Sequence, residues 1–211
     1  MTQQELERLI AICEKTGYKI FRNPGEINII YLEGLTMGYS LEKNADQLDG
    51  WNDVRMLVDF IQDTPRLLFW QVATTEPGAA ATVSEAARKR GGVARIAFGQ
   101  YLECWVMGVH KKMHEALVQV GPIKVHRDVD RNGIRTGDPI DYATGINQHT
   151  TSPNFRGPNV GRWSEGCLVG RSYKLHLRFI ALLKTDPRYI SKKRKFRFSS
   201  IILPADILFS E

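Results

Sequence analysis

The sequence predicts an α+β fold in which short β-strands form a sandwich or a barrel. From residue 67 onward, short apolar and β-branched runs follow one another with turn residues between them, which is typical of such a domain. Helical periodicity is found at the N-terminus, after residue 52 and after residue 172. Because Pro65 punctuates the chain, we expect an N-terminal α/β segment at 1–65 that packs on a main domain at 66–211.

The N-terminal segment begins with a helix signal. Thr2-x-x-Glu5 matches a capping box, and Gly17 follows as a stop. Residues 27–32 predict a strand, and residues 34–50 predict a loop. Asn52 is placed to cap a second helix that ends at Pro65. The inward faces of the two helices would consist of Leu6, Leu9, Ile10 and Cys13, and of Val54, Leu57, Val58 and Ile61.

The main domain is predicted to begin with a strand at 68–73. Residues 74–92 form a long connection with a short helix near 84–90. Further strands are predicted at 93–98, 103–109, 116–120, 123–126 and 140–146. Ser172 is expected to cap a helix that ends at Pro187, before a last strand at 196–203. The buried residues of that helix would be Leu175, Phe179, Ile180 and Leu183.

The composition is that of an ordinary globular protein. Of 211 residues, 43% are hydrophobic and 25% are charged, and the formal net charge is +6. Basic clusters at 88–90 and 192–195 are interpreted as solvated surface, so no nucleic-acid partner is expected. No apolar run approaches the roughly 20 residues of a membrane span. The first 20 residues lack the pattern of a signal peptide, so we expect synthesis in the cytoplasm.

One stretch carries the residue types of thiol catalysis. His149 is followed by a loop rich in Gly, Pro and Asn, and then by Ser164-Glu165-Gly166-Cys167. A thiolate can attack a carbonyl while an imidazole takes up and later returns a proton. Gly166 suits a sharp turn, and backbone N–H groups there could face an oxyanion. The other two cysteines, Cys13 and Cys104, suggest no disulfide framework.

His149 and Ser164-x-Gly166-Cys167 resemble the motif of the L,D-transpeptidases of the YkuD type. The separation of 18 residues between the His and the Cys lies in the range of that family. Two positions differ. Glu165 stands where the family usually has His, and Arg171 follows the Cys by four residues, where the family usually has Arg after two.

The resemblance implies a β-rich transpeptidase-like domain that acts on peptidoglycan stem peptides, as an L,D-transpeptidase or L,D-carboxypeptidase. Cys167 would be the nucleophile and His149 the base, and the backbone at Glu165, Gly166 and Cys167 would form the oxyanion hole. Ser164 would support the turn or bind substrate. The expected substrate-binding residues are Arg171, Glu165, Thr150 and Gln148, and Asn147 is expected to help orient the imidazole. A neighbouring His⁺ would favour the thiolate. No cofactor or metal is expected.

Two functions remain open at this stage. The first is a wall-lytic enzyme that reaches its substrate by cell lysis or on a phage or secretion particle, like an endolysin. The second is a non-catalytic β-rich structural or binding module of such a particle, in which the motif is only a turn. Neither the acyl acceptor nor the oligomeric state follows from the residues.

Two further patterns permit more than one interpretation. Asp128-x-Asp130-x-Asn132-Gly133 has the spacing of the first half of a calcium loop, but Pro139 stands at position 12, and a polar turn explains the pattern equally well. His110 and His114 are four residues apart. On a helix they could bind zinc, whereas in the predicted strand and loop context they would be a surface or hydrogen-bonded pair, or would touch the substrate.

Overall fold

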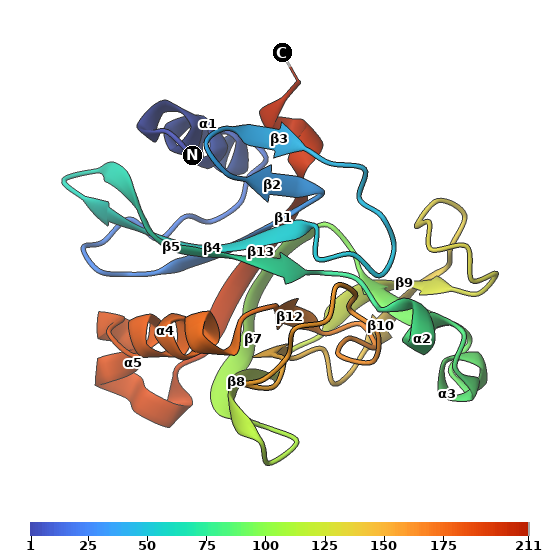
Figure 1. The fold of residues 1–211 in the computed structure, drawn as a ribbon. Helices are drawn as coiled ribbons and strands as arrows, with labels where there is room; N and C mark the ends of the chain where they lie inside the picture. Colours follow the sequence, from blue (N-terminus) through green and yellow to red (C-terminus); the bar gives the residue numbers. More distant parts are fainter. Residues whose placement is uncertain (211) are drawn as a thin grey trace.

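The computed structural model describes residues 1–210, and its centre is a closed β-barrel of eight strands (Figure 1). This architecture confirms the expectation of a strand-rich α+β fold. Around the barrel the strands are β1 (Asn28–Glu33), β13 (Phe198–Pro204), β7 (Gly99–His110), β8 (His114–Gln119), β11 (Gln148–Thr150), β12 (Leu168–Gly170), β5 (Thr64–Thr74) and β4 (Asp53–Ile61).

Two smaller sheets and several helices surround the barrel (Figure 1). The three-stranded sheet has the order β10 (Ile140–Ala143), β9 (Ile123–Asp128) and β6 (Val93–Ile96), and β2 (Leu35–Met37) pairs with β3 (Leu41–Lys43). The helices are α1 (Gln3–Lys15), α2 (Ala79–Thr82), α3 (Glu85–Lys89), α4 (Tyr173–Leu183), α5 (Pro187–Lys192), η1 (Lys193–Lys195) and η2 (Ala205–Leu208). Within residues 1–210, no helix combines the length and the apolar character needed to cross a membrane.

Strand β1 is buried on both faces, which explains the apolar run from Ile29 to Leu32 in its middle. Ile29 and Tyr31 belong to the core that extends from the barrel interior to α4. Ile30 and Leu32 point the other way, into a second core that α1 covers. Since successive side chains of a strand alternate in direction, a strand with a core on each side has consecutive apolar residues where it crosses both cores.

Helix α1 begins and packs as the sequence predicts. The hydroxyl of Thr2 accepts a hydrogen bond from the Glu5 N–H, and the Glu5 carboxylate accepts one from the Thr2 N–H. The four predicted inward residues are all buried. Gly17 follows the helix with a φ of +86°, a conformation that glycine adopts without strain.

The predicted second helix is wrong, because these residues form β4 of the barrel. Strand β4 pairs with β5 through a two-residue turn at Gln62 and Asp63, which both have positive φ. Pro65 therefore lies inside β5, opposite Phe60. In a hairpin of this kind that pair exchanges no backbone hydrogen bonds, so the missing proline N–H costs nothing.

The β4–β5 hairpin spans the position at which the sequence suggested a boundary between two parts of the chain. The position at which the sequence suggested a boundary, Pro65, lies within the β4–β5 ladder. Strands β1 and β4 come from residues 1–65 and separate β13 from β5 in the barrel. The predicted loop at 34–50 is only partly a loop, because it contains the β2–β3 hairpin.

Most other elements lie near their predicted positions. Ser84 caps α3, and Ser172 caps α4 through the N–H of Leu175. Leu175 itself is 36% exposed, and His176 is buried in its place. Helix α4 ends at Leu183, before Pro187, which is instead the first residue of α5.

Candidate active site

Strands β11 and β12 lie side by side and parallel, and they bring the predicted nucleophile and base to one face. His149 pairs with Val169, and the N–H of Leu168 donates to the Asn147 carbonyl at 2.9 Å. Because side chains alternate along a strand, Asn147 and His149 point to the same side as Cys167. Cys167 and His149 line one pocket of about 480 Å³.

The turn before Cys167 is held by Ser164. Its hydroxyl donates to the Cys167 carbonyl at 2.8 Å and accepts from the Gly166 N–H at 3.2 Å. Its own carbonyl accepts from the Gly78 N–H at 3.0 Å, and the residue is fully buried. Ser164 therefore supports the turn, which is one of its two predicted roles, and it does not line the pocket.

Gly166 is required by its backbone conformation and by its surroundings. Its φ is +117°, and a Cβ atom at this position would lie 2.5 Å from the carbonyl oxygen of Ala94 on β6. Because its N–H is bound to Ser164, it is not available to an oxyanion. The N–H groups of Glu165 and Cys167 donate to no acceptor within residues 1–210, so these two backbone donors remain for that role.

The Cys167 thiol is partly buried and protonated at rest. It donates to the Gly145 carbonyl at 3.2 Å and accepts from the Asn147 N–H at 3.5 Å. Burial raises the pKa of the thiol to about 11, against smaller opposing effects of the Asn147 N–H and Lys111. This contradicts the expectation of a thiolate favoured by a charged imidazole.

His149 is neutral, and its tautomer follows from its hydrogen bond. The Nδ1 atom lies 2.9 Å from the Thr150 carbonyl oxygen, which can only accept, so Nδ1 carries the proton. The lone pair is then on Nε2. Burial and the neighbouring His110 lower the pKa of His149 to about 3.

His110 stacks on His149 and fixes the plane of its ring. The two ring centres are 3.9 Å apart, and the ring planes differ by 8°. The Asn147 side chain joins this pair, because its Oδ1 accepts from the Gln119 N–H at 3.0 Å and its Nδ2 lies 3.1 Å from His110 Nδ1. Asn147, which was expected to help orient the imidazole, therefore orients His110 and acts on His149 only through that ring. Burial lowers the pKa of His110 to about 4.

Four of the five histidines gather in this region, and one of them, His176, was not predicted from the sequence to belong to it. His110 and His114 pair across the β7–β8 hairpin, so the helical spacing that would favour zinc is absent. His176 on α4 lies against His114, with ring centres 5.6 Å apart. Its position on the apolar face of the predicted helix was the available signal, because a histidine there must be buried.

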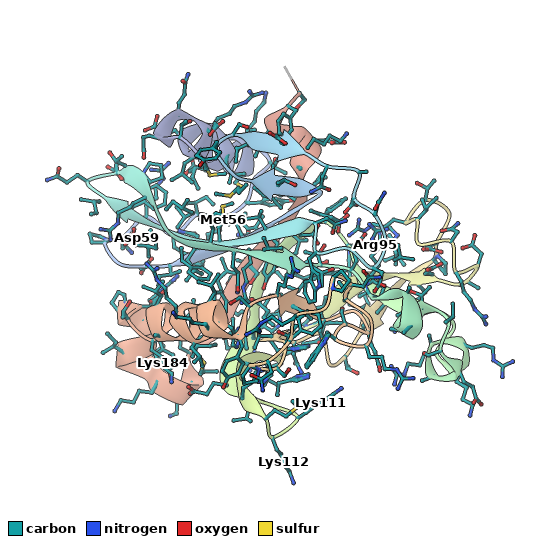
Figure 2. The ribbon with its side chains drawn as sticks, in the orientation of Figure 1. Met56, Asp59, Arg95, Lys111, Lys112 and Lys184 are labelled. Atoms are coloured by element: carbon teal, nitrogen blue, oxygen red, sulfur yellow. The ribbon has the colours of Figure 1, made fainter. Side chains whose placement is uncertain are left out.

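The pocket around Cys167 is lined by four cationic side chains and one carboxylate. Glu165 lies at the pocket as predicted, and its carboxylate is 3.6 Å from Arg90. Lys111 comes from the tip of the β7–β8 hairpin (Figure 2). The other two cations are Arg127 and Arg162. Sequence reasoning did not select these residues, because they come from four separate segments.

Three predicted substrate-binding residues lie elsewhere. Arg171 lines a different pocket beside Trp70 and Tyr173. Gln148 points into the barrel, where it accepts from the Tyr31 hydroxyl and donates to Ser200. The Thr150 hydroxyl donates to the Gly170 carbonyl at 2.8 Å and is fully buried. Gln148 and Thr150 alternate with His149 along β11, so they face away from the pocket.

No protein-family model, curated protein or solved structure matches this chain.

Proposed function

We propose that this protein is a cysteine-nucleophile enzyme of the L,D-transpeptidase or L,D-carboxypeptidase type that acts on peptidoglycan stem peptides. One observation carries the proposal: Cys167 and His149 line one cationic pocket from adjacent parallel strands. The sequence motif around Ser164-x-Gly166-Cys167 supports the same reaction type. The transpeptidase-like character of the barrel is part of the proposal.

The proposed reaction begins from a neutral thiol and a neutral imidazole. Nε2 of His149 takes the thiol proton, and Sγ of Cys167 attacks the carbonyl carbon at the L-centre of a diamino acid. The Cys167 N–H stabilises the oxyanion. When the tetrahedral intermediate collapses, the imidazolium returns the proton to the leaving amine, and the terminal D-amino acid departs. Water or a second amine then resolves the thioester.

Because the pKa of Cys167 is about 11 and that of His149 is about 3, the ion pair does not exist at rest. The proton must therefore move in concert with the attack, as in general-base catalysis. The high pKa of the thiol makes its thiolate a strong nucleophile once formed.

The charge of the pocket favours an anionic substrate. Arg90, Lys111, Arg127 and Arg162 line it with the carboxylate of Glu165. Arg90 lies 3.6 Å from Glu165 and Arg127 pairs with Asp141, whereas Lys111 and Arg162 make no ion pair within residues 1–210. Stem peptides carry carboxylates at the terminal D-residue and, in many walls, on the diamino acid. Arg162 therefore takes the substrate-binding role that was expected of Arg171, since a planar guanidinium binds a carboxylate through two hydrogen bonds, and Lys111 adds a second positive charge.

The second candidate function is a non-catalytic module of a phage particle or secretion machine. The neutral resting state of Cys167 and His149 favours it, because a buried protonated thiol is usually inert. Under the first proposal the enzyme acts on the wall after release or delivery, and under the second the pocket only binds.

Mass spectrometry of defined muropeptides decides between the two. Tetrapeptide and pentapeptide substrates are incubated with the wild type and with Cys167→Ala. The proposal expects loss or exchange of the terminal D-residue with the wild type, and a loss of at least about 10³-fold in rate with Cys167→Ala. The product mass identifies the acceptor as water or an amine.

Cys104→Ala is the matched control, because it removes a buried thiol that lies outside the pocket. This variant should retain the wild-type rate. Turnover that survives in Cys167→Ala would remove the thiol from the mechanism, and no turnover by any protein would favour the binding module.

A further inference from the structure

The loop between β9 and β10 brings three aspartates together. Ligand oxygens of Asp128, Asp130 and Asp138 all lie within 4.8 Å of one another. Counted from Asp128 as position 1, they occupy positions 1, 3 and 11. Pro139 at position 12 had weakened the calcium interpretation of the sequence. The fold replaces the missing ligand, because Asp138 supplies a carboxylate from the neighbouring position.

Two oxygens of this cluster are buried without a partner. Asp128 is 3% exposed, and its Oδ1 atom has no hydrogen-bond partner within residues 1–210, while its Oδ2 accepts from the Gly133 N–H at 3.1 Å. The Oδ2 atom of Asp138 is also buried and without a partner. A buried carboxylate oxygen without a donor is costly, so each of these atoms requires a hydrogen-bond donor or a cation.

Two arginines in and beside the loop are engaged with other carboxylates. Arg127 pairs with Asp141 at 3.0 Å, and Arg135 pairs with Glu33. Within the described residues 1–210, no ion pair reaches Asp128, Asp130 or Asp138.

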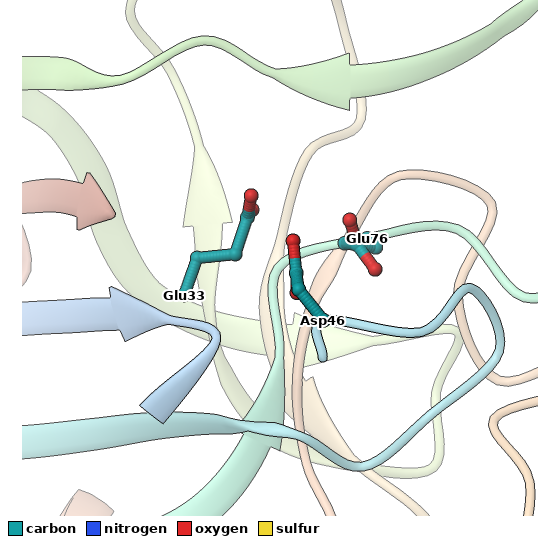
Figure 3. Close-up of side chains that lie close together, drawn as sticks. All are labelled: Glu33, Asp46 and Glu76. Carbon is teal, nitrogen blue, oxygen red and sulfur yellow. The ribbon is translucent and has the colours of Figure 1, made fainter. Parts of the chain in front are cut away.

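A second acidic cluster on the same side of the barrel differs from the aspartate cluster, because a cationic side chain of the protein lies within it. Glu33, Asp46 and Glu76 point toward one another (Figure 3). The guanidinium of Arg95 lies among them, with Nη2 at 3.2 Å from both Glu33 and Asp46 and in contact with Glu76. This cluster already contains its cation, so it offers no metal site.

The aspartate loop is anchored before any ion binds. Arg95 donates to the Gly133 carbonyl, and Arg135 reaches the carboxylate of Glu33 in the barrel wall. Gly133 has a φ of +72°, which allows the sharp turn at position 6. An anchored loop loses little conformational entropy when it binds an ion.

We propose that Asp128, Asp130 and Asp138 form a calcium-binding site at the end of β9. Three carboxylates, binding through one or two oxygens each, supply three to six of the 6–8 oxygen ligands that Ca²⁺ takes, and water completes the shell. The irregular loop suits Ca²⁺ better than Mg²⁺, which demands near-octahedral geometry and keeps its water. The site does not depend on the reaction proposed for Cys167.

The test measures Ca²⁺ binding by isothermal titration calorimetry and by thermal unfolding of protein freed of metal with a chelator. We expect a dissociation constant between about 10⁻⁵ and 10⁻³ M, and a Tm rise of about 5 °C or more when CaCl₂ exceeds it 100-fold. Asp130→Asn and Asp138→Asn should each weaken binding at least about 10-fold. Asp130 is exposed, so its replacement leaves folding intact even if Asp128→Asn does not fold.

The matched control is Asp63→Asn in the β4–β5 turn, where asparagine also tolerates the positive φ. This variant should bind Ca²⁺ as the wild type does. The proposal is overturned if the wild type shows neither heat nor a Tm shift, if Asp130→Asn and Asp138→Asn bind like Asp63→Asn, or if MgCl₂ binds as tightly as CaCl₂.

Discussion

At the scale of single residues, Gly166 connects the barrel to the candidate nucleophile. Its backbone passes so close to β6 that a methyl group would meet the Ala94 carbonyl. Ser164 then uses both its hydroxyl functions to hold the backbone on either side of Gly166. The position of Cys167 thus depends on the absence of a Cβ atom at Gly166 and on the buried hydroxyl of Ser164.

Gly166→Ala should destabilise the protein by about 2 kcal/mol or more, because the change combines strained backbone with a steric conflict. Gly137→Ala is the matched control. Its φ is +91°, but a Cβ there meets nothing within 4 Å, so only the backbone strain of about 1 kcal/mol applies. Urea unfolding measures both variants. Equal losses would mean that the approach of β6 does not constrain Gly166.

The histidines near the pocket should remain neutral well below the usual pKa of about 6.5. Burial lowers the pKa of His110 to about 4 and that of His149 to about 3. The unfolded chain binds these protons first, so their contribution to stability is complete above about pH 6.5 and is lost as the pH falls toward 4 and 3. Asp53 acts in the opposite direction, because burial raises its pKa to about 8.

The histidines and Asp53 change the stability of the protein in opposite directions as the pH changes. NMR therefore follows the protonation of each imidazole separately. At pH 6, both His110 and His149 should show the ¹⁵N shifts of neutral rings, with the proton of His149 on Nδ1. His149→Gln and His110→Gln assign the signals. A midpoint near 6.5 for His149 would show that its ring is hydrated and would contradict its burial in the structure.

At the scale of elements, the β4–β5 hairpin shows how a helical pattern can be misleading. Val54, Leu57, Val58 and Ile61 have helical spacing, but the same segment also has apolar residues at every second position from Val54 to Phe60. The structure selects the second pattern, because α1 covers that face of β4.

Two neighbouring side chains test the register of this hairpin. Phe60 is 1% exposed and Ile61 is 49% exposed. Phe60→Ala should cost about 3 kcal/mol in the free energy of unfolding, and Ile61→Ala less than about 1 kcal/mol. Denaturant unfolding of both variants is the measurement. The helical alternative, in which Ile61 faces the core, requires a large loss for Ile61→Ala.

At the scale of the whole molecule, closure of the barrel depends on the first 65 residues. β1 pairs with β13 on one side and with β4 on the other, so it joins the last strand of the chain to the first hairpin. Without β1 and β4, strands β13 and β5 would present open edges, and the core beneath α1 would be exposed.

A chain of residues 66–211 should therefore not fold alone. We expect no cooperative thermal transition and poor dispersion in its amide NMR spectrum, whereas the full chain should show both. Adding the peptide 1–65 in excess tests complementation, because the missing strands could then pair. A cooperative transition of 66–211 by itself would establish it as an independent domain.

Much of the secondary structure and the centre of the site could be predicted. Capping residues predicted α1 and α4, because a capping side chain binds a backbone N–H within three residues of its own position. The pair of Cys167 and His149 was recognisable because both lie in one short stretch. The cations of the pocket were not, because Arg90, Lys111, Arg127 and Arg162 meet only through tertiary structure.

The sequence by itself determined the strand-rich class, the turn at Gly166 and the identity of the candidate thiol and imidazole. These depend on local backbone preferences and on chemistry that each residue carries with it. Only the tertiary structure decided that residues 53–61 form a strand, that Arg171 leaves the pocket and that Asp138 joins Asp128. Such features depend on which surfaces are buried and which distant segments meet, and a linear pattern contains neither.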